Sequence, residues 1–379
     1  MKIEVVSTFE DIVEMRDEWR RLFQETQTNN IFLSWEWTYL WCKHFPEKRK
    51  QLLVLLIKDN NKRTIGIAPL MKVDEGLLNR PIIKFLGDEM MADYMDFLIS
   101  DNNTIEPILR FLYRKGDWAR IELKRIPEYS ETFLAIKTFL VNSTIPWSIE
   151  VDCTSPFIDI EGDWNEYYNS LSKSLKQDIR TTVNKLGRSG KIQYENLNED
   201  NIKQGLESLF EMHKRRQENK VGISIFESER NQAFFIDVAT TFLRLQWTDI
   251  SVLKLNGKII SAVFALKIKD VFYYWIPSFD PDYIKYSLGK LSIYMLLQQC
   301  FKLGYKRFDF MIGDEEYKLR WTNRRFNNYC IKIFKTKFGK QLEGFRLDTK
   351  RYLRSIKNAS PELKRIWVKL SKGKIFRND

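Results

Sequence analysis

Histidine and cysteine are the scarcest chemistry-bearing residues of this 379-residue chain. The two histidines, His44 and His213, are too few to build a histidine-based transition-metal site. The four cysteines, at 42, 153, 300 and 330, have no paired short spacing, so neither a zinc site nor a disulfide framework is indicated. We therefore expect no metal cofactor and a reducing, cytoplasmic compartment.

Long apolar stretches are also missing. A run such as 52–57 reaches only six residues, whereas a helix that spans a membrane needs about 20. The amino terminus begins a short strand and then turns acidic, unlike a secretory signal. With 44% hydrophobic residues the chain is nonetheless globular, and its length allows two domains.

Positive charge is concentrated at the end of the chain. The net charge is +12, and residues 335–379 hold 14 Lys or Arg against four acids, which leaves +2 for the rest. Within 358–379, Leu363, Ile366 and Trp367 fall on one stripe of a predicted basic helix. Such a helix can contact an anionic membrane or nucleic acid, or it can pack on its own domain with its basic face in solvent.

Strand and helix patterns alternate along the chain. Aromatic and β-branched residues predict a strand over 271–279, apolar spacing predicts a helix over 289–303 that Gly304 ends, and alternation predicts a strand over 306–312. This order is typical of a crossover unit in an α/β domain. Elsewhere the patterns predict helices over 9–25, 35–45, 105–114 and 164–190, hairpins over 52–73 and 250–269, and strands over 94–100 and 118–124.

The start of the helix over 289–303 is predicted to bind an anion. Ser287 can cap the helix, Gly289 lets a ligand approach bare backbone N–H groups, and Lys290 adds a full positive charge. In the alternative, the glycine serves only to make a turn. The expected donor-binding residues are Ser287, Leu288, Gly289, Lys290 and Leu291.

Acidic residues follow the next strand, where open α/β sheets bind their ligands. A half-buried carboxylate close to other acids has a raised pKa and can accept a proton near neutral pH. We predict Asp309, Asp314 or Glu315 as a base or amine-positioning group, with Tyr317 and Lys318 as proton donor or oxyanion partner. The same run could instead cap a short helix.

These motifs resemble the GNAT-type N-acyltransferases of the CelD-like group, which are related to the FemAB peptidyl transferases. The resemblance is carried by a Ser-x-Gly helix start at 287–289, Gly-x-x-x-x-Asp-Phe at 304–310 and Gly-Asp-x-x-Tyr-Lys at 313–318. It covers about residues 30–325 and includes Leu175–Arg180, His213–Arg216, Trp35, Trp37, Trp41 and Pro69–Leu70.

The resemblance implies an α/β fold with mixed sheets, built from two tandem GNAT-like domains in which helices flank each sheet. We expect a degenerate platform domain over 1–150, an acyltransferase domain over 151–334 and a basic, partly amphipathic helical tail over 335–379. Weak similarity between 115–121 and 303–309 supports a duplicated fold.

The expected chemistry follows from the donor. An acyl thioester is already activated, so a positioned amine can attack it without a serine or cysteine nucleophile. The resemblance implies acyl-CoA, with acetyl-CoA favoured, as donor and an amino sugar, nucleotide sugar or other amine precursor of the cell envelope or of an exopolysaccharide as acceptor. His213, Arg216 and Trp35 are expected substrate contacts.

Two alternatives stay open. One is a FemAB-type transfer from aminoacyl-tRNA to a lipid-linked precursor, in which the basic tail would have a nucleic-acid or membrane role. The other is a scaffold without catalysis that docks on anionic membranes through 358–379. In each case we expect a cytoplasmic protein, with peripheral contact at the inner face of the membrane where the tail binds lipid.

Overall fold

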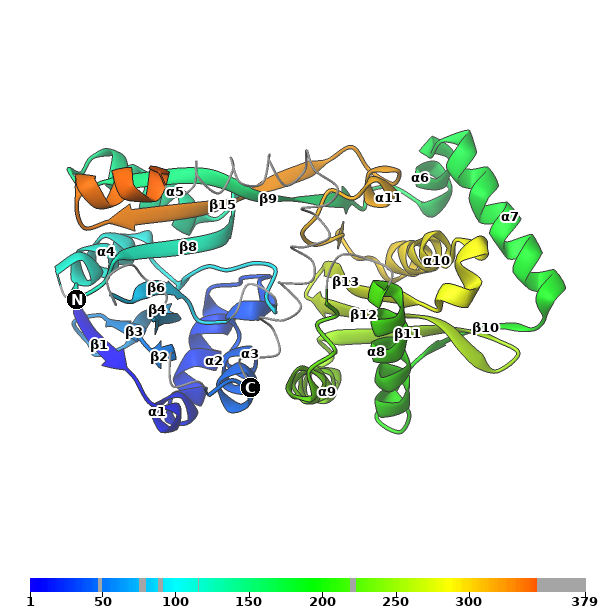
Figure 1. The fold of residues 1–379 in the computed structure, drawn as a ribbon, viewed down its shortest axis with the longest axis horizontal. Helices are drawn as coiled ribbons and strands as arrows, with labels where there is room; N and C mark the ends of the chain where they lie inside the picture. Colours follow the sequence, from blue (N-terminus) through cyan, green and yellow to red (C-terminus); the bar gives the residue numbers. More distant parts are fainter. Residues whose placement is uncertain (47–49, 75–79, 88–90, 115, 219–222, 346–379) are drawn as a thin grey trace, which may run out of the picture.

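The computed structural model describes residues 1–46, 50–74, 80–87, 91–114, 116–218 and 223–345 (Figure 1). The predicted basic helix over 358–379 lies outside this range, as does most of the predicted tail. Within these ranges no helix is both long and apolar enough to cross a membrane.

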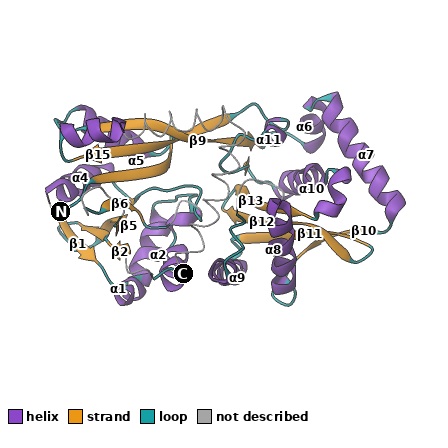
Figure 2. Ribbon diagram, viewed as in Figure 1, coloured by secondary structure: helices purple, strands orange, loops and turns teal. Residues whose placement is uncertain are grey.

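The protein is a mixed α/β structure, as predicted, with helices on the faces of its sheets (Figure 2). The helices are α1 (Phe9–Glu14), α2 (Arg16–Glu25), α3 (Trp35–His44), α4 (Ile105–Arg114), α5 (Glu131–Val141), α6 (Trp164–Ser170), α7 (Lys173–Ser189), α8 (Ile202–Glu218), α9 (Glu229–Arg244), α10 (Leu288–Leu303) and α11 (Glu316–Leu319). The strands are β1 (Lys2–Val6), β2 (Lys50–Leu52), β3 (Val54–Lys58), β4 (Thr64–Ala68), β5 (Leu70–Val73), β6 (Ile82–Phe85), β7 (Leu98–Ile99), β8 (Arg120–Pro127), β9 (Trp147–Asp159), β10 (Ile192–Asn196), β11 (Thr248–Leu255), β12 (Lys258–Ile268), β13 (Val271–Phe279), β14 (Arg307–Asp309) and β15 (Arg325–Phe334).

One large sheet runs through both halves of the chain. Among the described residues its strand order is β10-β11-β12-β13-β14-β9-β15-β8-β6-β5-β2, and a second sheet has the order β1-β3-β4-β7. The long strands β9 and β15 run along the top of Figure 1 from the first half to the second, and they pair with each other in antiparallel fashion. The domain boundary that we predict near residue 150 falls inside β9, and the division into domains stays a prediction.

The two predicted hairpins are confirmed. β11 and β12 pair around the turn at Asn256 and Gly257. In the first half, β3 pairs with β4 in the smaller sheet, whereas β2 pairs with β5 in the larger one. The hairpin over 52–73 therefore contributes to both sheets, which the alternation of its residues does not reveal.

Three predicted elements are wrong in their extent. The strand over 94–100 is reduced to β7, and the helix over 164–190 breaks at Leu171, whose backbone is extended before the next helix begins. The strand over 306–312 ends at Asp309, because Met311 adopts a left-handed conformation with φ 61° and its N–H binds the Asp309 side chain. After β14, the Asp309 side chain thus accepts a backbone N–H that a continued strand would have paired with a neighbouring strand.

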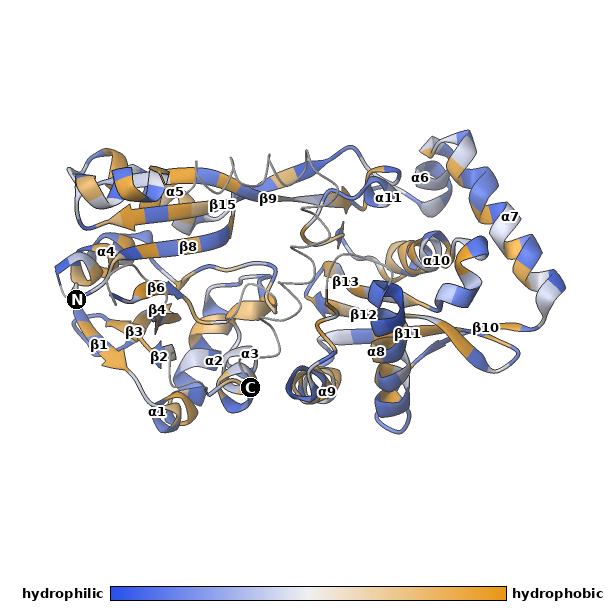
Figure 3. Ribbon diagram, in the orientation of Figure 1, coloured by the Kyte–Doolittle hydropathy of each residue, from blue (hydrophilic) through white to orange (hydrophobic). Residues whose placement is uncertain are grey.

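The helices of the second half lie on opposite faces of β13. Phe272 and Tyr274 pack with α10 residues in one cluster, whereas Val271 and Tyr273 belong to the main core that includes α8 and α9. Neighbouring strand residues point to opposite faces, so this alternation separates an α10 face from a face that meets the first half. In Figure 3 α10 is more apolar than α8, which is largely hydrophilic on its visible side.

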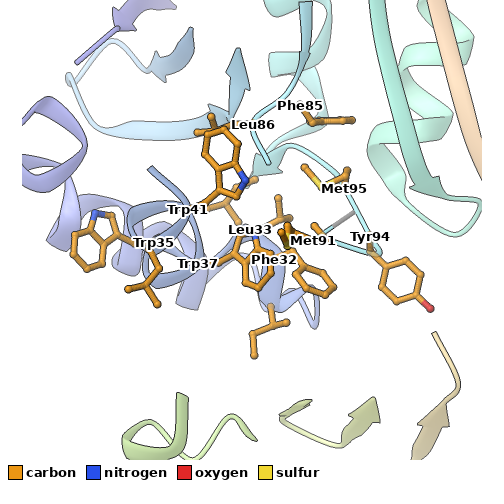
Figure 4. Packing of buried hydrophobic residues seen from close by; sticks show 14 of the residues in the cluster. Phe32, Leu33, Trp35, Trp37, Trp41, Phe85, Leu86, Met91, Tyr94 and Met95 are labelled. Carbon is orange, nitrogen blue, oxygen red and sulfur yellow. The ribbon is translucent and has the colours of Figure 1, made fainter. Parts of the chain in front are cut away.

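Aromatic residues join the two halves into one core. Trp37 of α3 makes edge contacts with Phe32 at 4.8 Å between ring centroids, with Phe234 of α9 at 5.2 Å and with Trp275 of β13 at 5.8 Å. Figure 4 shows Trp37 and Phe32 within a dense group of buried side chains from the first half. The halves therefore share both a sheet and a hydrophobic core.

We predict that Trp37→Ala destabilises the whole chain. Because the indole is 1% exposed, its loss should lower the free energy of unfolding by about 3–5 kcal/mol, as measured by urea denaturation. Phe338→Ala is the control, since Phe338 is 70% exposed and should change stability by no more than about 0.5 kcal/mol. A loss below about 1 kcal/mol for Trp37→Ala would show that the aromatic contacts do not hold the halves together.

Candidate active site

Two neighbouring parallel strands part in the middle of the large sheet. β13 and β14 pair only at Val271 with Arg307, Phe272 with Phe308 and Tyr273 with Asp309. β13 continues to Phe279, but β14 ends at Asp309. A gap in the backbone ladder therefore begins directly beyond Asp309 and extends along β13 towards its carboxyl end at Phe279. The carboxyl ends of strands are where open α/β sheets place their ligands.

The amino-terminal end of α10 is open and packs in one cluster with Phe279, at the carboxyl end of β13. A Cβ added at Gly289 would meet no atom within 4 Å, so the backbone there is accessible. The expected cap is wrong, because Ser287 adopts a left-handed conformation with φ 53° and its side chain makes no capping hydrogen bond. Leu288 and Leu291 are buried in the core, so each can offer a ligand only its backbone N–H group.

The lysine at this helix start already has a partner. Lys290 Nζ donates to Asp178 Oδ2 at 2.6 Å, and Arg320 donates to the same oxygen at 2.9 Å. These hydrogen bonds hold the pKa of the Asp178 carboxyl below its ordinary value. Two cations share one carboxylate, which leaves a single net positive charge beside the first turn of α10.

Asp309 is a buried carboxylate at the point where the strands part. Its Oδ1 accepts hydrogen bonds from the Tyr94 hydroxyl and the Met311 N–H, both at 2.7 Å. Burial raises the pKa of Asp309 to about 6, although these two hydrogen bonds oppose the rise. The side chain is therefore mostly ionised at pH 7 and can still accept a proton there.

A cavity of about 280 Å³ lies between the halves and is lined by Asp309. Asp309 Oδ2 accepts no hydrogen bond from a described residue, so it is free to meet a ligand in the cavity. Asp96 also lines the cavity, and burial raises its pKa to about 6. Arg307 reaches it too, but its guanidinium already binds Asp159 at 3.0 Å. The cavity thus favours a neutral or cationic group over a phosphate.

A buried lysine holds the loop that follows β14. Lys318 Nζ donates to the carbonyl oxygens of Ile312 at 2.7 Å and Gly313 at 3.3 Å, and it pairs with Glu315 at 2.9 Å. These three partners match the three protons of an ammonium group. Lys318 therefore supports the loop, which leaves Asp314 exposed beside it.

Tyr317 lies near charged groups of the second half. Burial raises the pKa of its hydroxyl, nearby Glu315 adds to the rise, and Arg216 opposes it. Arg216 also stacks over Phe279 at 4.9 Å and donates to Pro277 O at 3.4 Å. Arg216, an expected substrate contact, and Tyr317, an expected proton donor or oxyanion partner, thus lie near each other at the end of β13.

The other two predicted substrate contacts have partners of their own. His213 Nδ1 lies 2.7 Å from Ser224 Oγ. Trp35 stacks on Tyr39, and its Nε1 donates to Ile12 O at 2.7 Å inside the first half. Neither residue is among those that line the cavity.

Sequence reasoning missed the contribution of the first half. Tyr94 and Asp96 lie in the stretch 94–100 that it assigned to a strand, Asp93 directly precedes that stretch, and all three lie around the buried end of β14. Acids within or beside a predicted buried strand were the available signal, because such acids need partners or a function.

Comparisons with known proteins identify the fold. Residues 173–319 match the family model described as acetyltransferase (GNAT) domain. The crystal structure of FemX is 10% identical, covers 90% of this chain and 100% of its own, and has a TM-score of 0.60. A conserved protein of unknown function from Bacteroides thetaiotaomicron is 12% identical, with coverages of 87% and 100% and a TM-score of 0.55. L-PGS from Bacillus licheniformis is 12% identical, with coverages of 85% and 92% and a TM-score of 0.53. No curated protein sequence matches the chain.

We predict that Lys318→Met loosens the loop over 312–318. The substitution leaves two buried carbonyl oxygens and Glu315 without their donor, which should cost roughly 1–3 kcal/mol of stability. Hydrogen exchange of the loop amides should become faster, while Glu316→Gln, at an exposed position nearby, should leave exchange unchanged. Unaltered exchange in Lys318→Met would mean that the loop keeps its shape without the ammonium group.

Proposed function

We propose that this protein transfers an acyl group from acyl-CoA to an amine acceptor, because residues 173–319 match the model of an acetyltransferase (GNAT) domain. The observation that carries the proposal is the position of Asp309. It is a buried, ionisable carboxylate at the point where β13 and β14 part, and it lines a cavity on one face of the sheet. The open start of α10 lies at the carboxyl end of β13.

The donor is expected to bind at the start of α10. Bare N–H groups and the positive end of the helix dipole attract the pyrophosphate of coenzyme A, contributing roughly 0.3–2 kcal/mol. Gly289 allows phosphate oxygens to approach the backbone, and the net charge of the Lys290, Arg320 and Asp178 group adds attraction. Leu288 and Leu291 would contribute through their backbone alone, whereas the Ser287 N–H already donates to Ile284 O at 3.1 Å.

The acceptor is expected on the opposite face, in the cavity between the halves. A volume of about 280 Å³ is at the lower end of small-molecule sites, so the cavity would take the reacting end of the acceptor. Its carboxylates suit an amine with neighbouring hydroxyl groups, such as an amino sugar. Within these classes, we propose acetyl-CoA as the donor and a nucleotide sugar or another cell-envelope precursor as the acceptor.

The reaction requires one proton acceptor. The amine nitrogen attacks the thioester carbonyl carbon, a C–N bond forms, and the amine proton passes to Asp309 Oδ2. The tetrahedral centre then collapses, the C–S bond breaks, and the coenzyme A sulfur leaves as a thiolate that takes up a proton. The products are an amide and free coenzyme A. With its pKa near 6, Asp309 is ready to accept a proton at pH 7.

We expect Gly289→Asp to abolish coenzyme A binding. The new side chain fits in open space, as the Cβ position shows, but it places a negative charge where phosphate would approach. Isothermal titration calorimetry should show heat for the wild type and none for the variant up to millimolar ligand.

Gly344→Asp is the matched control, since position 344 is also a helical glycine with open space around it. It should bind coenzyme A as the wild type does. Absence of heat with the wild type would remove the acyl-CoA proposal, and a titration with tRNA in its place would then test an aminoacyl-tRNA donor.

We expect Asp309→Asn to lower kcat/KM by roughly 10²–10⁴ while leaving coenzyme A affinity unchanged. Thiol release from acetyl-CoA in the presence of a panel of primary amines, including glucosamine and ethanolamine, measures the rate. Asp314→Asn removes an exposed carboxylate of the same region. If Asp314→Asn were the slower variant, the proton acceptor would be Asp314 and not Asp309.

A further inference from the structure

We propose that Tyr94, a residue of the first half, is a positioning residue that orients Asp309 and sets its proton affinity, so that the first half completes the active site. The inference rests on the proposed role of Asp309 as proton acceptor. It assigns to the first half a chemical contribution beyond that of a platform.

The hydrogen bonds to Asp309 leave only one of its two carboxylate oxygens available to accept a proton. The Tyr94 hydroxyl and the Met311 N–H both donate to Oδ1, each at 2.7 Å. Two donors occupy the lone pairs of that oxygen. Oδ2 is therefore the oxygen left to take a proton from an acceptor in the cavity, and rotation of the carboxylate would break both bonds.

Buried polar groups surround the Tyr94 hydroxyl. Asn328 Nδ2 donates to Ser155 Oγ at 2.9 Å. Ser155 lowers the pKa of Tyr94 and so favours its ionised form, and Tyr94 donates to Asp309. All four side chains are 2% exposed or less. In such a dry environment a polar neighbour acts strongly on a hydrogen bond.

The backbone around Tyr94 is held as firmly as its hydroxyl. Asn30 Nδ2 donates to Tyr94 O at 3.4 Å, and Met95 N–H donates to Arg125 O at 3.0 Å. The Arg125 guanidinium also lies 3.8 Å from Asp93. In Figure 4 the Tyr94 ring stands at the edge of the aromatic group and its hydroxyl points away from it. The irregular segment that replaces the predicted strand thus places this hydroxyl.

The sign of the effect follows from the groups around Asp309. Burial raises its pKa, the Tyr94 and Met311 hydrogen bonds and the Arg307 charge lower it, and the Asp93 charge raises it. Tyr129 and Tyr273 also face Asp309, and its charge raises the pKa of each. Tyr94 thus favours the ionised form of Asp309. Without the hydroxyl the pKa of Asp309 must rise, and less of the base is ionised between pH 6 and 7.

The test is Tyr94→Phe, which removes one oxygen and keeps the ring. The acid limb of the kcat/KM profile against pH should move to higher pH by roughly one unit, so that the rate falls about fivefold at pH 6 and little at pH 8. The same amine is used for both proteins, which cancels the ionisation of the acceptor. Tyr167→Phe is the matched control, because its hydroxyl also donates inside the protein, to Trp321 O at 2.9 Å, but Tyr167 does not line the cavity and donates no hydrogen bond to Asp309. Its acid limb should stay in place.

A second measurement does not depend on catalysis. In protein labelled with ¹³C at the aspartate carboxyls, the Asp309 signal is identified by its loss in Asp309→Asn, and its titration midpoint should rise in Tyr94→Phe. If neither the wild type nor the variant transfers an acyl group, the proposed function fails. The titration of Asp309 still decides the role of Tyr94.

An unchanged midpoint and an unchanged acid limb in Tyr94→Phe would overturn the inference, as would an equal loss of rate at every pH. If Tyr94→Phe does not fold, Ser155→Ala takes its place. This change removes the polar neighbour that lowers the pKa of Tyr94, and it should shift the Asp309 midpoint in the same direction by a smaller amount. No shift would count against the inference.

Discussion

The termination of β14 at Asp309 is the constraint on which the rest of the site depends. Because β13 continues beyond Tyr273 and β14 ends at Asp309, the sheet opens there. The pairing of Val271 to Tyr273 with β14 still holds the two strands together. The turn is stabilised by the Asp309 side chain itself, which accepts the Met311 N–H. One residue thus ends the strand, lines the cavity and supplies the carboxylate.

Placing that carboxylate inside the protein has a cost that the neighbouring groups offset. Burial disfavours its charged form, and two hydrogen bonds and a nearby arginine favour it. The balance leaves the pKa near 6, between that of a solvated aspartate and that of a carboxyl with no partners. A general base near neutral pH needs this intermediate value, and it depends on residues of both halves of the chain.

The continuous sheet explains why both halves can contribute to such a site. β9 and β15 pair with each other and carry the sheet from β8 of the first half to β14 of the second. The shared aromatic core adds contacts between α3, α9 and β13. Both connections fix the distance between Tyr94 and Asp309, which are separated by 215 residues in sequence.

Local pattern was enough to predict the regular parts of this protein. Period-2 and helical spacing located β13, α10 and both hairpins, and the positive φ of Gly304 agrees with its predicted place at the end of α10. The same patterns failed where side chains replace backbone pairing, as at 94–97 and after Asp309. Hydrophobic periodicity indicates whether a side chain faces the core or the solvent. It does not indicate whether that side chain makes a hydrogen bond to a residue far away in the sequence.

By itself, the sequence determined the mixed α/β class, the motifs within the region that matches the acetyltransferase (GNAT) model and the acidic stretch that contains Asp309. Tertiary structure decided which acid is buried, that Lys290 and Lys318 are already paired, and that Tyr94 meets Asp309. The reason is physical: local propensities act over a few residues, whereas burial and pairing of charges depend on groups that only the folded chain brings together.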